Sequence, residues 1–258
     1  MAVPVKFVAG TINVEASEQS GGGSGNQPGQ TPGGGGGGGG AGGGVDDSAE
    51  DTATITNPDG SVTTTSTKVE VIEGKDGSTT TITTTNTTTE ETDGTATESE
   101  TVEKTIKKAD GTEITTTKTE TTSSNGSKST TTVDEQGNVE AKVTVSNAAV
   151  QTAAKADESV TLPMPEVAAT VDTQTAPVVI VDLPADAGET KVEIPVSNPT
   201  VSTVVVIVSE DGTEEVVKAT IMSENGVTVP LSEDATIKIV DNGQIFDDVE
   251  NNDWFNDA

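Results

Sequence analysis

The strongest constraint on this chain is a turn dipeptide that returns at a fixed interval. Asp-Gly occurs at 59–60, 76–77, 93–94 and 110–111, always with a period of 17, and Asn125-Gly126 and Gln136-Gly137 follow at shorter intervals. Asp-Gly and Asn-Gly tolerate the positive φ angles that close tight hairpins. The spacing therefore predicts a meander of long antiparallel strands over residues 51–138, with one strand in each repeat.

The predicted strands are built mainly from threonine. Thr supplies more than a third of the segment from Asp51 to Val133, whereas Val and Ile together supply only ten positions. Thr is β-branched, which restricts χ1 and favours strands. A sheet of this composition has no ordinary hydrophobic face, so we expect backbone ladders and cross-strand Thr pairs, worth roughly 0.2–1 kcal/mol each, to hold it. We therefore expect a one-layer spacer that is extended or partly disordered.

Two other uses of so much threonine are an ice-binding surface and a glycosylated stalk. A flat array of Thr-x-Thr on one face binds ice or another crystal surface, but that array must carry few charges, and Glu and Lys interrupt every repeat here. The composition is also compatible with an O-glycosylated stalk.

The fold class we predict is mainly β, in five segments. Residues 1–16 alternate like the end strands of an upstream β domain, and residues 17–50 form a disordered Gly/Ser/Pro-rich linker with an unbroken glycine run from Gly33 to Gly40. Residues 51–138 are the Thr-rich repeat, 139–240 a small β-sandwich-like or barrel domain, and 241–258 an incomplete start of a further repeat.

Short apolar runs separated by turn residues support the small β domain. Ser146 is placed to cap an Ala-rich helix from Asn147 to Ala156. The predicted strands cover residues 139–145, 159–162, 178–181, 191–196, 204–208, 215–222, 227–231 and 236–240.

Charge and composition exclude several classes of protein. The chain carries 43 Asp and Glu against 13 Lys and Arg, a net charge of −30, which opposes binding to nucleic acid phosphates and to anionic lipid. It contains no Cys, so no disulfide framework, and no His, which excludes the usual zinc sites. No run of about 18 apolar residues is present, so no membrane span is predicted.

Catalytic machinery is not indicated, and we predict that the chain is not an enzyme. Without His, a serine or cysteine hydrolase lacks its usual base. The many carboxylates leave part of an extracellular glycan-active enzyme as a remote alternative, although sugar sites use aromatic platforms and the single Trp lies near the end of the chain.

The C-terminal residues resemble the opening of an S-layer homology repeat. That family begins with Phe-x-Asp-Val, followed by polar residues and an aromatic start to the first helix. The residues that match in order are Phe246, Asp248, Val249, Trp254, Phe255 and Ala258. The resemblance implies that they are packing residues, and that repeats lying past Ala258 attach the protein noncovalently to secondary cell wall polysaccharide.

Acidic residues crowd the same tail. Carboxylates are suitable calcium ligands, but no Asp-x-Asn/Asp-x-Asp-Gly loop is present. We therefore predict no cofactor, with calcium as the alternative. The acidic residues are Asp241, Asp247, Asp248, Glu250, Asp253 and Asp257.

The segments before the tail resemble the wall-proximal region of S-layer-domain proteins of Firmicutes, at residues 160–165, 191–196, 211–218 and 237–242. The resemblance implies an extracellular cell-wall protein, and the residues after Met1 do not form a signal peptide, so we expect truncation at both ends. The predicted function is a non-enzymatic cell-surface spacer that links an upstream domain to the S-layer homology repeats. The alternative is an adhesin or ligand-binding module at 139–240.

Overall fold

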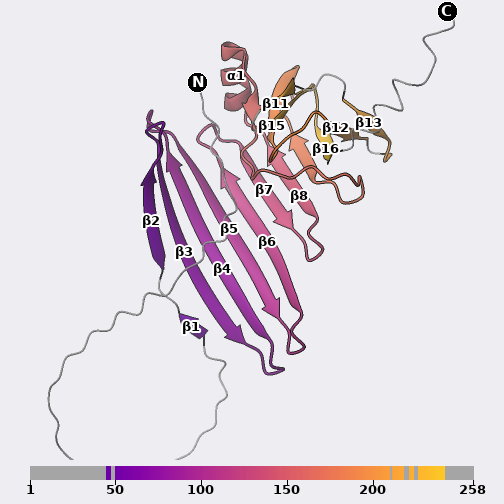
Figure 1. The fold of residues 1–258 in the computed structure, drawn as a ribbon. Coiled ribbons are helices and arrows are strands. Elements are labelled where there is room, and N and C mark those ends of the chain that lie inside the picture. The colour runs from indigo at the N-terminus through magenta and orange to yellow at the C-terminus, as the bar shows by residue number, and fades with distance from the viewer. Residues whose placement is uncertain (1–44, 48–49, 210, 218–220, 224–225, 242–258) are drawn as a thin grey trace, which may run out of the picture.

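A computed structural model describes residues 45–47, 50–209, 211–217, 221–223 and 226–241 (Figure 1). The predicted mainly-β class is confirmed, with 55% strand and 5% helix. The predicted strands of residues 1–16, most of the glycine-rich linker and the tail at 242–258 lie outside the described residues.

The Thr-rich repeat forms the predicted antiparallel meander (Figure 1). The strands β3 (Val62–Glu73), β4 (Thr79–Glu90) and β5 (Ala96–Lys107) are equal in length, and the turns that join them are equal too, which gives the constant period of the sequence. The meander continues through β6 (Glu113–Thr122), β7 (Lys128–Val133) and β8 (Val139–Thr144). On the other side of β3 lie β2 (Asp51–Thr56) and β1 (Val45–Asp47), the latter from the predicted linker.

The turns follow one hydrogen-bonding scheme, which the turn between β3 and β4 illustrates. The Gly74 N–H donates to the Ser78 carbonyl at 2.7 Å, and the Gly77 N–H donates to the Gly74 carbonyl at 3.1 Å. Gly77 has φ +81°, a left-handed conformation that glycine adopts without steric cost. This is the geometry of a type I turn followed by a bulge, and it confirms the role predicted for Asp-Gly.

The large sheet does not end with the meander. Strand β8 pairs with β7 on one side and, in parallel, with β10 (Val178–Asp182) on the other, so the predicted boundary between residues 138 and 139 lies within one 12-stranded sheet. Its last strands are β16 (Ala235–Asp241), β12 (Thr203–Val208) and β13 (Glu214–Val216).

A second sheet of four strands forms the other layer of a sandwich-like unit. Its strand order is β14-β15-β11-β9. The interior between the two layers holds fully buried Val143, Val179, Ile237, Val192 and Val229. The four strands are β9 (Val160–Thr161), β11 (Thr190–Pro195), β14 (Ile221–Met222) and β15 (Gly226–Leu231).

The single helix of the described residues, α1 (Asn147–Ala156), has the predicted bounds. The Ser146 hydroxyl accepts a hydrogen bond from the Ala149 N–H at 3.1 Å, which is the expected N-cap contact. The helix ends at Asp157, whose φ is 54°. It buries Ala149, Val150 and Ala153 against the core.

One predicted strand is wrong. Residues 215–222 do not form a continuous strand, because this segment passes from one layer to the other. Strand β13 pairs with β12 in the large sheet, whereas β14 pairs with β15 in the small sheet. Each piece is short, and each lies at the edge of its sheet.

Candidate functional surface

The pairing of the hairpins divides the side chains of the meander between two faces. Facing residues in each hairpin have numbers of the same parity, as in Thr65 with Thr87 and Thr87 with Ser99. Successive residues of a strand point to opposite faces. Odd-numbered residues therefore share one face, and that face continues into the core of the sandwich-like unit through Val143 and Val179.

We call the odd-numbered residues of β3 to β7 the hydroxyl face, because nearly three quarters of them are Thr or Ser. Its charged residues lie toward one end, around the turns that follow β3 and β5: Glu73, Glu103, Lys107 and Glu113. The hydroxyl residues are Thr63, Thr65, Thr67, Thr79, Thr81, Thr83, Thr85, Thr87, Thr89, Thr97, Ser99, Thr101, Thr105, Thr115, Thr117, Thr119, Thr121, Ser129 and Thr131.

The even-numbered residues of the same strands form the opposite face, which we call the charged face. Its charged residues are as numerous as its Thr and Ser, and it carries the isoleucines of the meander from β3 to β6. The charged residues are Lys68, Glu70, Glu90, Glu98, Glu100, Lys104, Lys118, Glu120 and Lys128. The charges that interrupt every repeat in the sequence are therefore mostly turned away from the hydroxyl face.

At the end of the hydroxyl face away from these four charged residues, three rows of side chains on β3, β4 and β5 form a regular array, which we call the central lattice. Neighbouring strands place side chains about 4.8 Å apart, and alternate residues of one strand lie roughly 6.8 Å apart. Thr89 is buried and the other members are partly exposed. The three rows are Thr63–Thr89–Thr97, Thr65–Thr87–Ser99 and Thr67–Thr85–Thr101.

Hydrogen bonds between threonines align parts of this face. The hydroxyl oxygens of Thr63 and Thr89 are 3.1 Å apart, and those of Thr101 and Thr119 are 3.0 Å apart. Because β-branching restricts χ1, each Thr has few alternative positions for its hydroxyl and methyl groups. The face is therefore ordered at the level of side chains as well as backbone.

The length of the repeat allows the effect of the face to be separated from the effect of the position in the repeat. Since the period of 17 is odd, the same repeat position turns to opposite faces in successive strands. The seventh strand position reads Lys68, Thr85, Val102 and Thr119. Threonine occurs where that position points to the hydroxyl face, and Lys or Val where it points to the charged face. A simple repeat would carry the same residue on both faces.

Two further positions of the repeat follow the same rule, whereas the tenth, which reads Val71, Thr88, Thr105 and Thr122, does not. The ninth position reads Glu70, Thr87, Lys104 and Thr121, and the eleventh reads Ile72, Thr89 and Ile106. The sequence-based prediction missed this surface because it counted the charges in each repeat without assigning them to a face. Comparing every second repeat would have revealed it.

The hydroxyl face runs under the edge of the second layer at β7. The Ser129 hydroxyl donates to the Pro163 carbonyl, in the segment that follows β9. Thr119, Thr121 and Thr131 are also buried. Thr131 is 5% exposed, and its hydroxyl finds no hydrogen-bond partner within the described residues.

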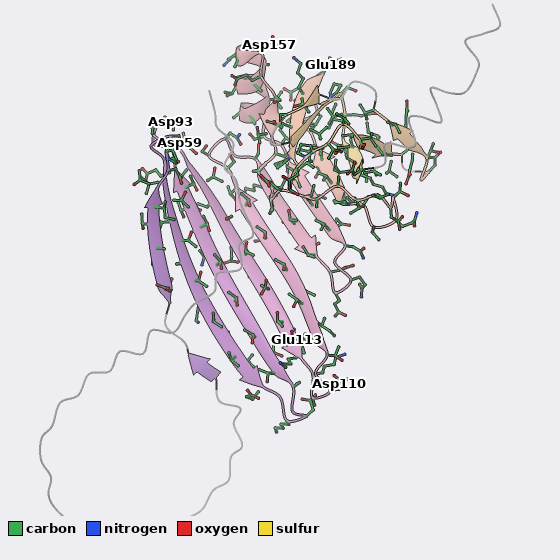
Figure 2. All side chains as sticks on the ribbon, in the orientation of Figure 1. Asp59, Asp93, Asp110, Glu113, Asp157 and Glu189 are labelled. Atoms are coloured by element: carbon green, nitrogen blue, oxygen red, sulfur yellow. The ribbon has the colours of Figure 1, made fainter. Side chains whose placement is uncertain are left out.

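The turns present a second recurring feature, a carboxylate that binds the backbone two residues ahead. Asp59 and Asp93 lie at one end of the meander and Asp110 at the other (Figure 2). The Asp59 Oδ1 accepts hydrogen bonds from the Ser61 hydroxyl at 2.7 Å and from the Ser61 N–H at 3.0 Å, and these contacts lower the pKa of Asp59. Hydrogen bonds from Ser78, Thr95 and Thr112 likewise lower the pKa values of Asp76, Asp93 and Asp110.

We expect these four aspartates to make the meander less stable in acid. A carboxylate whose pKa is lower in the folded state contributes its stabilisation above the unfolded pKa, about 3.9, and loses it as the pH falls through the folded pKa. Replacing all four with Asn should flatten the fall in melting temperature below about pH 4, measured by circular dichroism. Asn125 shows that an amide oxygen fits this turn, since it accepts from the Ser127 N–H at 2.9 Å.

The control for this variant must remove the same charge, because losing four negative charges from a chain of −30 reduces self-repulsion by itself. Replacing Glu90, Glu98, Glu100 and Glu103 with Gln meets that requirement on strands rather than turns. Equal pH profiles for the two variants would contradict the turn carboxylates as the cause.

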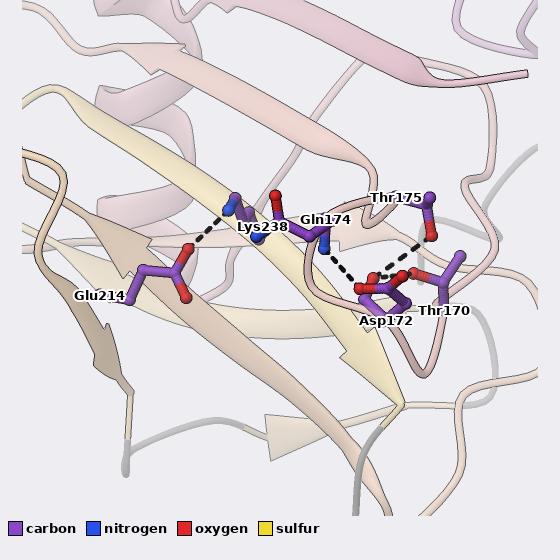
Figure 3. Close-up of polar contacts among 6 residues, drawn as sticks. All are labelled: Thr170, Asp172, Gln174, Thr175, Glu214 and Lys238. Atoms are coloured by element: carbon purple, nitrogen blue, oxygen red, sulfur yellow. Dashed lines mark hydrogen bonds and ion pairs between the residues drawn. The ribbon is translucent and has the colours of Figure 1, made fainter. Parts of the chain in front are cut away.

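A smaller polar group lies beside β16 (Figure 3). The Lys238 Nζ and the Glu214 Oε1 are 2.5 Å apart, which joins β16 to β13. In a nearby loop, the hydroxyls of Thr170 and Thr175 both donate to the Asp172 carbonyl. The N–H of the last residue of β16 donates to the Thr170 carbonyl at 2.7 Å and fastens this loop to the strand. These contacts join elements of the fold to one another, so we assign no ligand to this group.

The residues predicted to match an S-layer homology repeat, Phe246 to Ala258, lie outside the described residues, as do the acidic residues after Asp241. Asp241 itself ends β16 and accepts from the Thr200 hydroxyl at 3.0 Å. In the part of the chain that the structure describes, no three Asp or Glu residues are grouped to hold a metal ion. The same part contains no helix long and apolar enough to cross a membrane.

Comparison with known proteins finds no match: no family model, no curated protein and no solved structure is similar to this chain.

Proposed function

We propose that the chain is a non-enzymatic spacer of an extracellular cell-wall protein. It would connect an upstream domain to S-layer homology repeats that attach the protein to secondary cell wall polysaccharide. Phe246, Val249 and Trp254 would then be packing residues at the start of the first repeat, together with Asp248, Phe255 and Ala258. The resemblance of the C-terminal residues to an S-layer homology repeat supports the attachment to the wall. The architecture of the meander supports the role as a spacer.

The observation that carries the spacer is the path of the chain across the large sheet. The chain enters at β2 on one side of β3 and later reaches β16 on the far side of β10. The eight strand-to-strand steps from β2 to β16 amount to roughly 38 Å at about 4.8 Å a step. Because hydrogen bonds link every neighbouring pair, the segments joined to the two ends would be held apart by an ordered plate rather than by a flexible coil.

A distance measurement tests the spacer directly. The chain has no native Cys, so spin labels on Thr52→Cys and Glu215→Cys would mark strands β2 and β13 uniquely. Ten strand spacings, roughly 48 Å along the sheet, separate these strands. We expect double electron–electron resonance to give one narrow distribution of distances between the two labels, centred at several tens of ångströms.

The control pair, Glu140→Cys with Glu215→Cys, spans only the sandwich-like unit, from β8 to β13. A narrow distribution for this pair together with a broad one for the long pair would contradict an ordered spacer. Retention of residues 1–258 on purified wall sacculi at physiological salt would contradict the second part of the proposal, because wall attachment is assigned to repeats that follow the spacer.

A further inference from the structure

We propose that the hydroxyl face is an ice-binding surface, with the central lattice of β3, β4 and β5 as its contact site. The ligand is crystalline water, which presents oxygen atoms in a regular array to a protein surface. The proposal does not depend on the spacer function, since it rests on the arrangement of one face of the meander.

The geometry of the central lattice fits an ordered array of water molecules. Its side-chain positions repeat at about 4.8 Å across the strands and roughly 6.8 Å along them, spacings in the range found between oxygens on the faces of ice, although the hydroxyl oxygens of Thr63 and Thr89 approach one another to 3.1 Å. The strands β3 to β6 run side by side along their length (Figure 1). Since sheets twist by roughly 20–25° per strand, we confine the flat contact to three adjacent strands.

The side chains suit the same ligand. Thr combines a hydroxyl, which hydrogen-bonds water, with a methyl group, which does not. Its restricted χ1 limits the positions of both groups. Every lattice residue is Thr except Ser99. The charges of the hydroxyl face, which would organise water around themselves, lie outside the central lattice, and the nearest of them on β3 to β7 is Glu103, one row beyond Thr101. On the neighbouring strand β2, Asp51 pairs with Thr67, so a carboxylate also borders one corner of the lattice.

At the seventh, ninth and eleventh positions of the repeat, Thr occurs according to the face to which the position points. Thr87, at the centre of the lattice, corresponds to Glu70 in β3 and Lys104 in β5, which both point to the charged face. A solvated spacer needs no such difference between its faces. A surface that contacts a neutral, regular ligand does.

Other ligands fit this face less well. A nucleic acid or phosphate ligand needs cations, which the central lattice lacks. Binding to a protein relies on Trp, Tyr and Arg anchors, and glycan sites use aromatic platforms, but residues 50–241 contain no aromatic residue and the chain has no Arg. Self-association is opposed by the net charge of −30.

An unpaired hydroxyl indicates where water is bound at the margin of the site. Thr131 continues the row of Thr67, Thr85 and Thr101 across the sheet. Its hydroxyl is buried and makes no hydrogen bond to any described residue. Buried polar groups of this kind are normally satisfied by an ordered water molecule. The row of the lattice would thus end in a water-binding hydroxyl.

The test uses the whole chain and two adjacent threonines of β4. Thr87→Lys places a charge at the centre of the lattice, whereas Thr88→Lys places the same charge on the opposite face, across from Glu98. Thermal hysteresis and the shape of single ice crystals are measured for the three proteins, with circular dichroism melting to confirm that each is folded. We expect wild type and Thr88→Lys to shape ice and Thr87→Lys to lose that activity.

Two results would overturn the proposal. One is a folded wild-type protein that neither shapes ice nor produces thermal hysteresis. The other is equal activity in Thr87→Lys and Thr88→Lys. If Thr87→Lys instead abolishes binding to an insoluble neutral polysaccharide, or dissociates an oligomer seen by ultracentrifugation, while ice growth is unaffected by wild type, the face has another occupant and the assignment to ice is wrong.

Discussion

Replacing Val143 with Asp is expected to unfold the sandwich-like unit and to remove order from the meander as well. Val143 is 0% exposed, on the face of β8 that packs into the core. A carboxylate there would be buried without a partner, which costs several kcal/mol or forces the strand out of the core. Strand β8 also carries the pairing between β7 and β10, so its loss separates the meander from the two-layered unit.

The reason to expect a wider effect is the composition of the meander. Strands β3 to β6 contribute no residue to the apolar core, and cross-strand Thr pairs stabilise by only roughly 0.2–1 kcal/mol each. An isolated sheet of this kind is marginal without a hydrophobic face to bury. Hydrogen exchange measured by mass spectrometry should therefore show lost protection in β5 to β7 as well as in β10 and β16.

Thr144→Asp provides the matched control for this experiment. It introduces the same side chain in the same strand, but on the exposed face. We expect its exchange pattern to match wild type. If Val143→Asp unfolds β10 and β16 while β3 to β7 keep their full protection, the meander is stable by itself and the dependence on the core is refuted.

Replacing Ile237 with Ala is expected to lower the free energy of unfolding of the sandwich-like unit by about 2–5 kcal/mol. Ile237 is 0% exposed in β16, where it lies between Val179 of β10 and Ile207 of β12. The substitution removes buried methyl and methylene groups and leaves a cavity that the surrounding strands fill only in part. Urea unfolding followed by circular dichroism measures the loss.

The same substitution at Ile72 separates a core effect from a change in strand propensity. Ile72 lies in β3 and is 40% exposed, so its removal creates no cavity. We expect Ile72→Ala to change the free energy of unfolding by less than about 1 kcal/mol, within the range of strand propensity. Comparable losses for the two variants would mean that β16 does not lie in a well-packed core.

Local signals in the sequence predicted most of the strands and the helix correctly. The regularly spaced Asp-Gly pairs marked the turns because glycine is needed at their left-handed position, and Gly60 and Gly94 have φ +90° and +82°. Ser146 marked the start of α1 because its hydroxyl satisfies a free backbone N–H of the first turn. These features depend on neighbours in the chain, so a single sequence contains them.

Features that depend on distant residues were not predicted. The parallel pairing of β8 with β10 joins segments that are far apart in the sequence, and it merges the meander with the sandwich-like unit in one sheet. The division of residues 215–222 between two layers also depends on which strands are available as neighbours. The hydroxyl face depends on the register of every hairpin, and the count of Glu and Lys in each repeat pointed away from it.

The odd length of the repeat limits how this protein can be lengthened by duplication. Inserting a single repeat unit among the existing strands would change the parity of every residue on one side of the insertion relative to the other. Threonines such as Thr63 and Thr65 would then move to the opposite face from those of the later strands, and the array would be split between the two sides of the sheet. Inserting two units together leaves the parity unchanged, so that the threonines on both sides of the insertion point to the same face. Gene duplication can therefore extend this surface only by pairs of strands.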